Sequence, residues 1–168
     1  MSPHNFSSAR APQRGVSMVE ALVALLVLSI GMLGIAGLYV TSLQANRTAL
    51  LRTQAVSLVN DMLDRIRSNP MARDNYDMAT YSNAPKNQSC VAAVNNCSYQ
   101  MLAQDDLYRW TESVKVVLPG TTTPKVTVTK AASKGRPDSY LVLVTWNEPG
   151  ETQPFSYQGN LTLIPVEP

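Results

Sequence analysis

The N-terminal part of the chain contains the stretch that decides the fold, QRGVSMVEALVALLVL at residues 13–28. It joins a basic segment to an apolar one through Gly15, and it places one carboxylate, Glu20, just inside the apolar part. The twenty residues from Ala21 to Val40 contain no charge. Because a helix rises about 1.5 Å per residue, a helix of that length is roughly 30 Å long, which matches the hydrocarbon layer of a bilayer. The sequence therefore predicts a membrane-spanning helix within residues 16–40.

The residues before this helix are typical of a leader that is removed and not of folded structure. Residues 1–15 contain Pro3, Pro12 and several serines, without apolar periodicity. An ordinary secretory signal is cut after its apolar region, whereas the glycine here precedes it. Arg10 and Arg14 have no acidic neighbours, and a short basic flank stays in the cytoplasm. We expect a cytoplasmic N-terminus and a C-terminal part in the periplasm.

Glu20 is the candidate functional residue of the helix. A charged side chain inside a membrane-spanning helix costs on the order of 2.5 to 3.5 kcal/mol, so it requires a cationic partner. Cleavage between Gly15 and Val16 would create a positive amine one helical turn before Glu20, and a neighbouring subunit can supply such an amine equally well. We therefore predict that Glu20 acts through charge pairing after the chain is cut.

Three glycines recur at every third position of the apolar helix, at Gly31, Gly34 and Gly37. Glycine lacks the Cβ atom that stiffens a helix and keeps neighbouring backbones apart, so these positions fit close helix packing or local melting of the helix. Glycine is also simply more frequent in membrane helices than in soluble ones. Both interpretations remain open.

The helix is expected to continue beyond the membrane through residues 41–69. No proline occurs between Val16 and Asn69, and Pro70 then ends the helix. Apolar residues at spacings of three and four form a one-sided stripe in this second half, at Leu51, Ala55, Leu58, Met62 and Ile66. That stripe predicts a helix that packs on a domain formed by residues 70–168.

Residues 71–110 show no sustained period, which predicts a long irregular connection. It contains Cys90 and Cys97, which lie beyond the membrane where oxidation is permitted, so we predict a disulfide; two free thiols are the alternative. Closing a loop of this size contributes about 2.5 kcal/mol in the chain-entropy model. The pair Asp105-Asp106 is interpreted as a solvated turn, and Trp110 and Trp146 as packing residues.

Four later segments have the composition of β-strands: Ser113–Leu118, Lys125–Lys130, Tyr140–Trp146 and Phe155–Ile164. Clusters of glycine, proline and polar residues separate the last three, and such short turns favour an antiparallel meander. The predicted fold is α+β, with a long N-terminal helix whose second half packs on a small antiparallel sheet.

The sequence offers little to an enzyme or to a nucleic-acid-binding protein. The single histidine, His4, lies in the expected leader, and we find neither metal-ligand spacing, nor a phosphate-binding loop, nor a nucleophile motif. Removing residues 1–15 leaves 12 of the 14 lysines and arginines against all 12 acidic residues. A chain with a net charge near zero exerts little long-range electrostatic attraction on a polyanion such as nucleic acid. We expect no catalytic residue, no metal, no cofactor and no nucleic acid.

The stretch around Gly15 resembles the N-terminus of bacterial type IV prepilins and of the pseudopilins of type II secretion. Their leader ends in a basic residue plus glycine, and the fifth mature residue is glutamate; Arg14, Gly15 and Glu20 stand at those positions, and the resemblance covers residues 13–38. It implies a pilin-like fold, and cleavage and N-methylation at Val16 by a prepilin peptidase. It also implies transfer from the lipid bilayer of the inner membrane into a filament with a core of packed N-terminal helices.

Residues 15–34, together with RIRSNP at residues 65–70, resemble the minor pilins of the PilV type. This resemblance implies contacts with other minor pilins and the major pilin, through the N-terminal helices, and with the assembly platform in the inner membrane. Such subunits are thought to form a tip complex that primes the pilus. Major pilins usually have phenylalanine where Val16 stands and often a proline where Gly37 stands, which favours a minor subunit.

Two alternatives share most of these features. A minor pseudopilin of a type II secretion system has the same leader and differs in its partner subunits. A single-pass membrane-anchored adhesin or binding module has the same helix and sheet, but it would keep residues 1–15 and would tolerate loss of the Glu20 carboxylate.

Overall fold

The computed structural model describes residues 15–81, 84–90, 96–120, 124–133, 135–148 and 150–165. Most of the predicted leader, with His4, Arg10 and Arg14, lies outside the described residues. The chain divides into two compact units, Met1–Leu43 and Gln44–Pro168.

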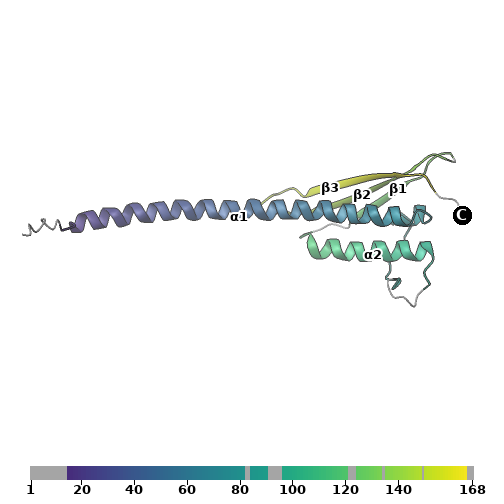
Figure 1. Cartoon of the computed structure of the whole chain (residues 1–168), viewed down its shortest axis with the longest axis horizontal. Helices are drawn as coiled ribbons and strands as arrows, with labels where there is room; N and C mark the ends of the chain where they lie inside the picture. The colour runs from purple at the N-terminus through teal and green to yellow at the C-terminus, as the bar shows by residue number, and fades with distance from the viewer. Residues whose placement is uncertain are drawn as a thin grey trace, which may run out of the picture. The chain divides into compact units, whose positions relative to one another are not determined.

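One long helix, α1 (Met18–Ser68), occupies most of the N-terminal third of the chain (Figure 1). It starts where the Val19 amide donates a hydrogen bond to Ser17 Oγ at 3.3 Å, and it contains no helix-breaking proline. Arg65 and Arg67 lie in its last turn, where cations favour the negative end of the helix dipole. The prediction of one helix between residues 16 and 69 is confirmed.

The second half of α1 buries one face, as the apolar stripe predicted. The buried residues are Leu51, Ala55, Val59, Met62, Leu63 and Ile66. Leu58, which the stripe included, is only partly buried at its margin. The spacing of the stripe thus gave the correct face of the helix.

A second helix, α2 (Tyr99–Val117), occupies residues 99–110 of the predicted irregular connection and nearly all of the predicted strand at Ser113–Leu118. The strand, and the irregular structure predicted for residues 99–110, are therefore wrong. Ser98 caps it by accepting a hydrogen bond from the Met101 amide at 3.3 Å. Its buried apolar residues recur at helical spacing, at Ala103, Leu107, Trp110 and Val114. The β-branched valines near its end suggested a strand, but packing of this face overrides that weak propensity. Two short 3₁₀ helices, η1 (Arg73–Tyr76) and η2 (Met78–Thr80), lie between α1 and α2 along the chain.

Three strands form the sheet: β1 (Lys125–Thr129), β2 (Asp138–Trp146) and β3 (Phe155–Leu163). They pair antiparallel in the order β1-β2-β3, which confirms the predicted meander. Val126 pairs with Val142, and Tyr140 with Leu161, so apolar side chains gather on one face. β2 alternates between buried and half-buried residues, as a central strand with one covered face does.

The hydrophobic core of the second unit forms where the second half of α1, α2 and the covered face of the sheet meet (Figure 1). Trp110 and Trp146 are both buried in it, as predicted. Gly159 of β3 lies so close to α1 that a Cβ atom added there would be 2.6 Å from Val59 Cγ1. The fold is therefore α+β, with a long apolar N-terminal helix packed on a three-stranded antiparallel sheet.

Candidate assembly site

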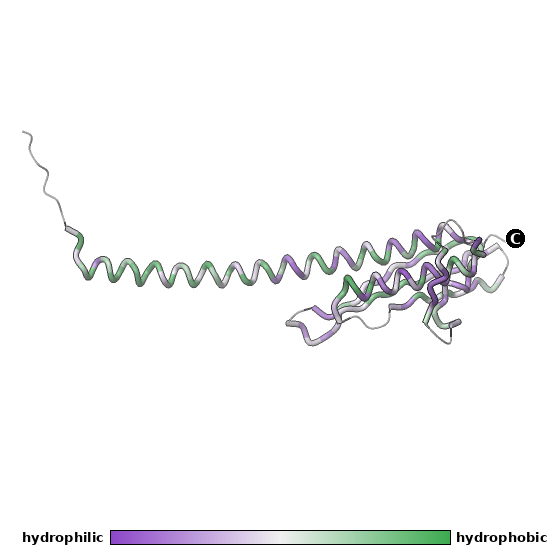
Figure 2. Tube along the Cα trace, turned by 90° about the horizontal axis from the view of Figure 1, so that it is seen from below, coloured by the Kyte–Doolittle hydropathy of each residue, from purple (hydrophilic) through white to green (hydrophobic). Residues whose placement is uncertain are grey.

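In its described residues, the first unit presents an apolar helical surface that no other part of the unit covers. Every large apolar side chain from Val16 to Leu43 is exposed, from 53% at Leu43 to 90% at Met18. Figure 2 shows the corresponding part of the trace in the colours of apolar residues. By its length and composition, and with its most apolar stretch entirely unburied, α1 is long and apolar enough to cross a membrane. Such a surface requires lipid or other helices around it.

Two hydroxyl groups in the apolar segment are satisfied by the helix itself. Ser29 Oγ donates to the Leu25 carbonyl at 2.7 Å, and Thr41 Oγ1 donates to the Leu38 carbonyl at 2.9 Å. Glu20 differs, because within the described part of the first unit its carboxylate has no hydrogen-bond or ion-pair partner. It lies in the first turn of α1, near the positive end of the helix dipole. Glu20 is thus the group of this surface that needs a partner from elsewhere.

Gly15, Val16 and Ser17 precede the first turn of α1 and are exposed. The peptide bond between Gly15 and Val16 is therefore outside regular structure, which is where a peptidase can reach a backbone. Arg14, the basic residue of the motif, lies outside the described residues.

Gly31, Gly34 and Gly37 are helical, and a Cβ atom added at any of them would meet nothing within 4 Å. Nothing among the described residues of the first unit therefore requires glycine at these positions. Close approach of another helix and local melting both remain predictions for them.

In the second unit, a cluster of polar and aromatic side chains ties α1 to the late part of the chain. Arg52 donates two hydrogen bonds to Glu148, from Nε to Oε1 at 3.0 Å and from Nη2 to Oε2 at 3.1 Å. Trp146 Nε1 donates to the same carboxylate at 3.2 Å, and the Arg52 guanidinium stacks 4.5 Å from the centre of the Phe155 ring. Sequence reasoning missed this cluster because its other members follow Arg52 by 94 to 103 positions. No local sequence pattern marks residues that are so far apart.

A second cluster corrects the prediction that Asp105-Asp106 is a solvated turn. Both residues lie in α2 and are buried. Asp106 accepts from Arg65 at 3.0 Å and from the Tyr76 hydroxyl at 2.8 Å. Burial raises the pKa of Tyr76, and the neighbouring Asp106 carboxylate raises it further, so this hydroxyl stays a donor.

Asp105 has partners of its own. Burial alone would raise the pKa of its carboxyl, but the hydrogen bonds from Arg109 at 2.7 Å and from the Gln88 amide at 2.7 Å hold that pKa below its ordinary value. The two carboxylates fix α2 to α1, to η1 and to the segment that carries Cys90. A turn was predicted because two adjacent acidic residues are rarely buried, and Arg65, the cation that pairs with Asp106, is distant in sequence.

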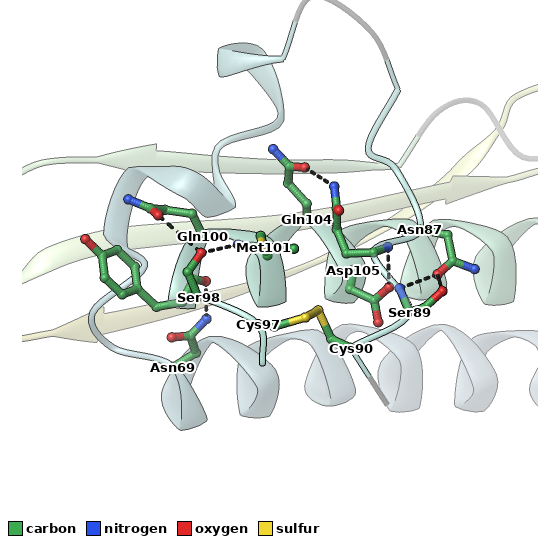
Figure 3. Close-up of a disulfide and its surroundings, with 12 residues drawn as sticks. Asn69, Asn87, Ser89, Cys90, Cys97, Ser98, Gln100, Met101, Gln104 and Asp105 are labelled. Atoms are coloured by element: carbon green, nitrogen blue, oxygen red, sulfur yellow. Dashed lines mark hydrogen bonds between the residues drawn. A yellow bond between two sulfur atoms is a disulfide. The ribbon is translucent and has the colours of Figure 1, made fainter. Parts of the chain in front are cut away.

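The predicted disulfide between Cys90 and Cys97 is confirmed (Figure 3). Gln88 anchors the segment before it to α2, through its amide on Asp105 and through its side-chain nitrogen, 2.7 Å from Gln104 Oε1. After the bridge, Ser98 caps α2, and Asn69 at the end of α1 donates to the Tyr99 carbonyl at 2.9 Å. The bridge therefore closes a segment that is attached to α2 at both ends.

Two protein-family models match the chain. The prokaryotic N-terminal methylation motif matches residues 10–36, and the model of the type IV pilin Tt1218 matches residues 37–108. Together the two segments cover residues 10–108, more than half of the 168 residues. No curated protein and no solved structure matches the chain.

Proposed function

We propose that this chain, which belongs to the type IV pilin family and carries its prepilin methylation motif, is a minor pilin of the PilV type that primes pilus assembly. The motif implies processing by a prepilin peptidase, and pilins are structural proteins without enzymatic activity. The observation that carries the proposal is the uncovered apolar part of α1, in which Glu20, inside the matched motif, lacks a partner among the described residues of the first unit.

In this proposal, residues 1–15 are the leader, residues 16–40 span the inner membrane, residues 41–69 continue the helix and residues 70–168 lie in the periplasm. Cleavage after Gly15 leaves an amine on Val16, which the peptidase methylates. A positive amine and the Glu20 carboxylate attract each other strongly in a medium of low dielectric constant, whether they belong to one subunit or to two. Pairing removes the cost of the isolated charge, so the helix can leave lipid for a bundle of other helices.

The choice of a minor subunit rests on the N-terminal helix. Val16 and Gly37 stand where major pilins usually have phenylalanine and often have proline. We propose that the partners are other minor pilins and the major pilin, through their N-terminal helices, and the assembly platform in the inner membrane. The subunit then resides in the inner membrane first and at the pilus tip afterwards.

The first test is mass spectrometry of the mature N-terminus in cells with and without the prepilin peptidase. We expect a chain that begins at methylated Val16 in the first strain and at Met1 in the second. A chain that keeps residues 1–15 in peptidase-positive cells would contradict the proposal and favour an anchored adhesin.

The second test measures, by immunoblotting of sheared pili, how much of the Glu20→Gln variant is incorporated. The control is Glu151→Gln, which removes an exposed carboxylate of the second unit. We expect Glu20→Gln to lose incorporation and to reduce the number of pili per cell, while the control matches the wild type. Normal pili together with failed protein secretion would instead identify a pseudopilin.

A further inference from the structure

A hollow of about 560 Å³ lies in the second unit, away from the helix that the proposed function uses. Its walls come from α2, from β1 and from the segment around η2, with Met78, Tyr81, Pro85 and Val126 as apolar walls. Pockets of this volume with mainly apolar walls and a few polar groups are typical of sites for small molecules.

One polar group in the wall has no partner of its own. Thr111 of α2 is only 7% exposed, and its hydroxyl lacks a hydrogen-bond partner among the described residues. A helical threonine commonly donates to the carbonyl of the preceding turn, but Thr111 Oγ1 makes no such hydrogen bond, and Thr111 is one of the residues that line the hollow. A buried hydroxyl without a partner is costly, so a ligand that reaches it recovers a hydrogen bond.

The charged groups around the hollow favour an anion. Lys115 lies one turn after Thr111 on α2, and Lys125 comes from β1. Lys115 pairs with Glu112 at 2.7 Å, while Lys125 forms no ion pair within the described ranges. The one carboxylate of the wall, Asp77, already accepts hydrogen bonds from the Ala79 and Val128 amides, at 2.9 and 3.1 Å.

We propose that this hollow binds a small organic carboxylate with an apolar body. The body packs between Met78, Pro85 and Val126, the carboxylate faces Lys125, and Thr111 Oγ1 makes the remaining hydrogen bond. The C-terminus of a peptide with an apolar last residue also combines a carboxylate with an apolar body. A peptide, however, has backbone N–H and C=O groups that need hydrogen-bond partners. The Val128 amide, an outward donor of the β1 edge, is already bound by Asp77, so the hollow suits a free small molecule better.

The test uses the full processed chain in nanodiscs, with methionine methyl groups labelled for NMR. Met78 reports on the hollow and Met62, buried in the core, reports on the fold. Titration with 3-phenylpropionate should shift the Met78 resonance saturably and leave Met62 unchanged. The neutral alcohol 3-phenylpropan-1-ol should bind about tenfold more weakly, since it lacks the charge.

Two variants test the polar groups. Thr111→Val keeps the shape of the side chain, Lys125→Gln removes the cation, and each should weaken 3-phenylpropionate about tenfold. Lys86 lies outside the wall of this hollow, so Lys86→Gln should leave the affinity for 3-phenylpropionate unchanged. An unshifted Met78, or affinities unchanged in both variants, would overturn the proposal. A peptide that ends in phenylalanine and binds more tightly than the free acid would overturn the assignment to a small molecule.

Discussion

Asp138, at the start of β2, shows how single residues hold charges inside the second unit. Its side chain is fully buried, and it accepts hydrogen bonds from Arg73 Nε at 2.9 Å, Arg73 Nη2 at 3.2 Å and the Ala131 amide at 2.9 Å. Burial alone would raise the pKa of this carboxyl, but these bonds hold the pKa below its ordinary value. The ionised form is therefore the one that the folded state stabilises.

This lowered pKa predicts how stability depends on pH. The contribution of Asp138 is fully present above the ordinary carboxyl pKa of about 4, and it is lost as pH falls through the lower pKa of the folded state. Asp138→Asn should therefore destabilise the protein by roughly 1–3 kcal/mol near neutral pH, and the difference from wild type should shrink in acid. Urea unfolding at several pH values measures it, with the exposed Asp64→Asn as control. A difference that stays constant with pH would contradict the assignment.

Gly159 makes a different prediction at the same scale. A Cβ atom there would lie 2.6 Å from Val59 Cγ1 and 2.9 Å from Leu63 Cδ1, and the χ1 angle of valine in a helix is stiff. Gly159→Ala should therefore cost about 1–3 kcal/mol through overpacking. Thermal unfolding should show the loss, whereas Gln158→Ala, at the exposed neighbouring position, should change little. Equal melting temperatures for the two variants would contradict this close approach.

At the scale of elements, the disulfide and α2 depend on each other. Replacing Cys90 and Cys97 by serine should remove about 2.5 kcal/mol of stability in the chain-entropy model. It should also speed hydrogen exchange at the Gln88 amide, because the bridge helps hold this donor on Asp105. Melting temperature and exchange at Gln88 test both effects, with exchange at Trp110 in the core as the internal reference. Unchanged exchange at Gln88 would mean that the Asp105 hydrogen bond holds the segment by itself.

The elements also show what the sequence could predict. α1, the meander and the disulfide followed from apolar period, turn residues and cysteine spacing, since each signal is local. The helical spacing of Ala103, Leu107, Trp110 and Val114 was available as a signal for α2, together with the Ser98 cap. It was missed because polar residues dilute the pattern. The ion pairs between Arg65 and Asp106 and between Arg52 and Glu148 could not be predicted from the sequence, because they depend on tertiary packing.

At the scale of the whole molecule, the two units place opposite demands on their surroundings. Among the described residues, the first unit is a helix with exposed apolar side chains and the Glu20 carboxylate, whereas the second unit has a hydrophobic core, ion pairs and a disulfide. A fragment from Gln44 to Pro168 should therefore be a folded monomer in water, while the full chain should require detergent. Light scattering and circular dichroism test this. Aggregation of the fragment, or its failure to unfold cooperatively, would show that the second unit cannot fold alone.

In the proposed membrane topology, the contacts of β3 with α1 bear on the order in which the second unit is completed during export. Arg52 and Val59 emerge early, but their partners Glu148, Phe155 and Gly159 lie within the last 21 residues of the chain. In that topology, the apolar stripe of α1 stays open to the periplasm until β3 has crossed the membrane. A chain stalled before β3 would expose that stripe to proteases and chaperones, so quality control could sense an incomplete second unit before the proposed assembly begins.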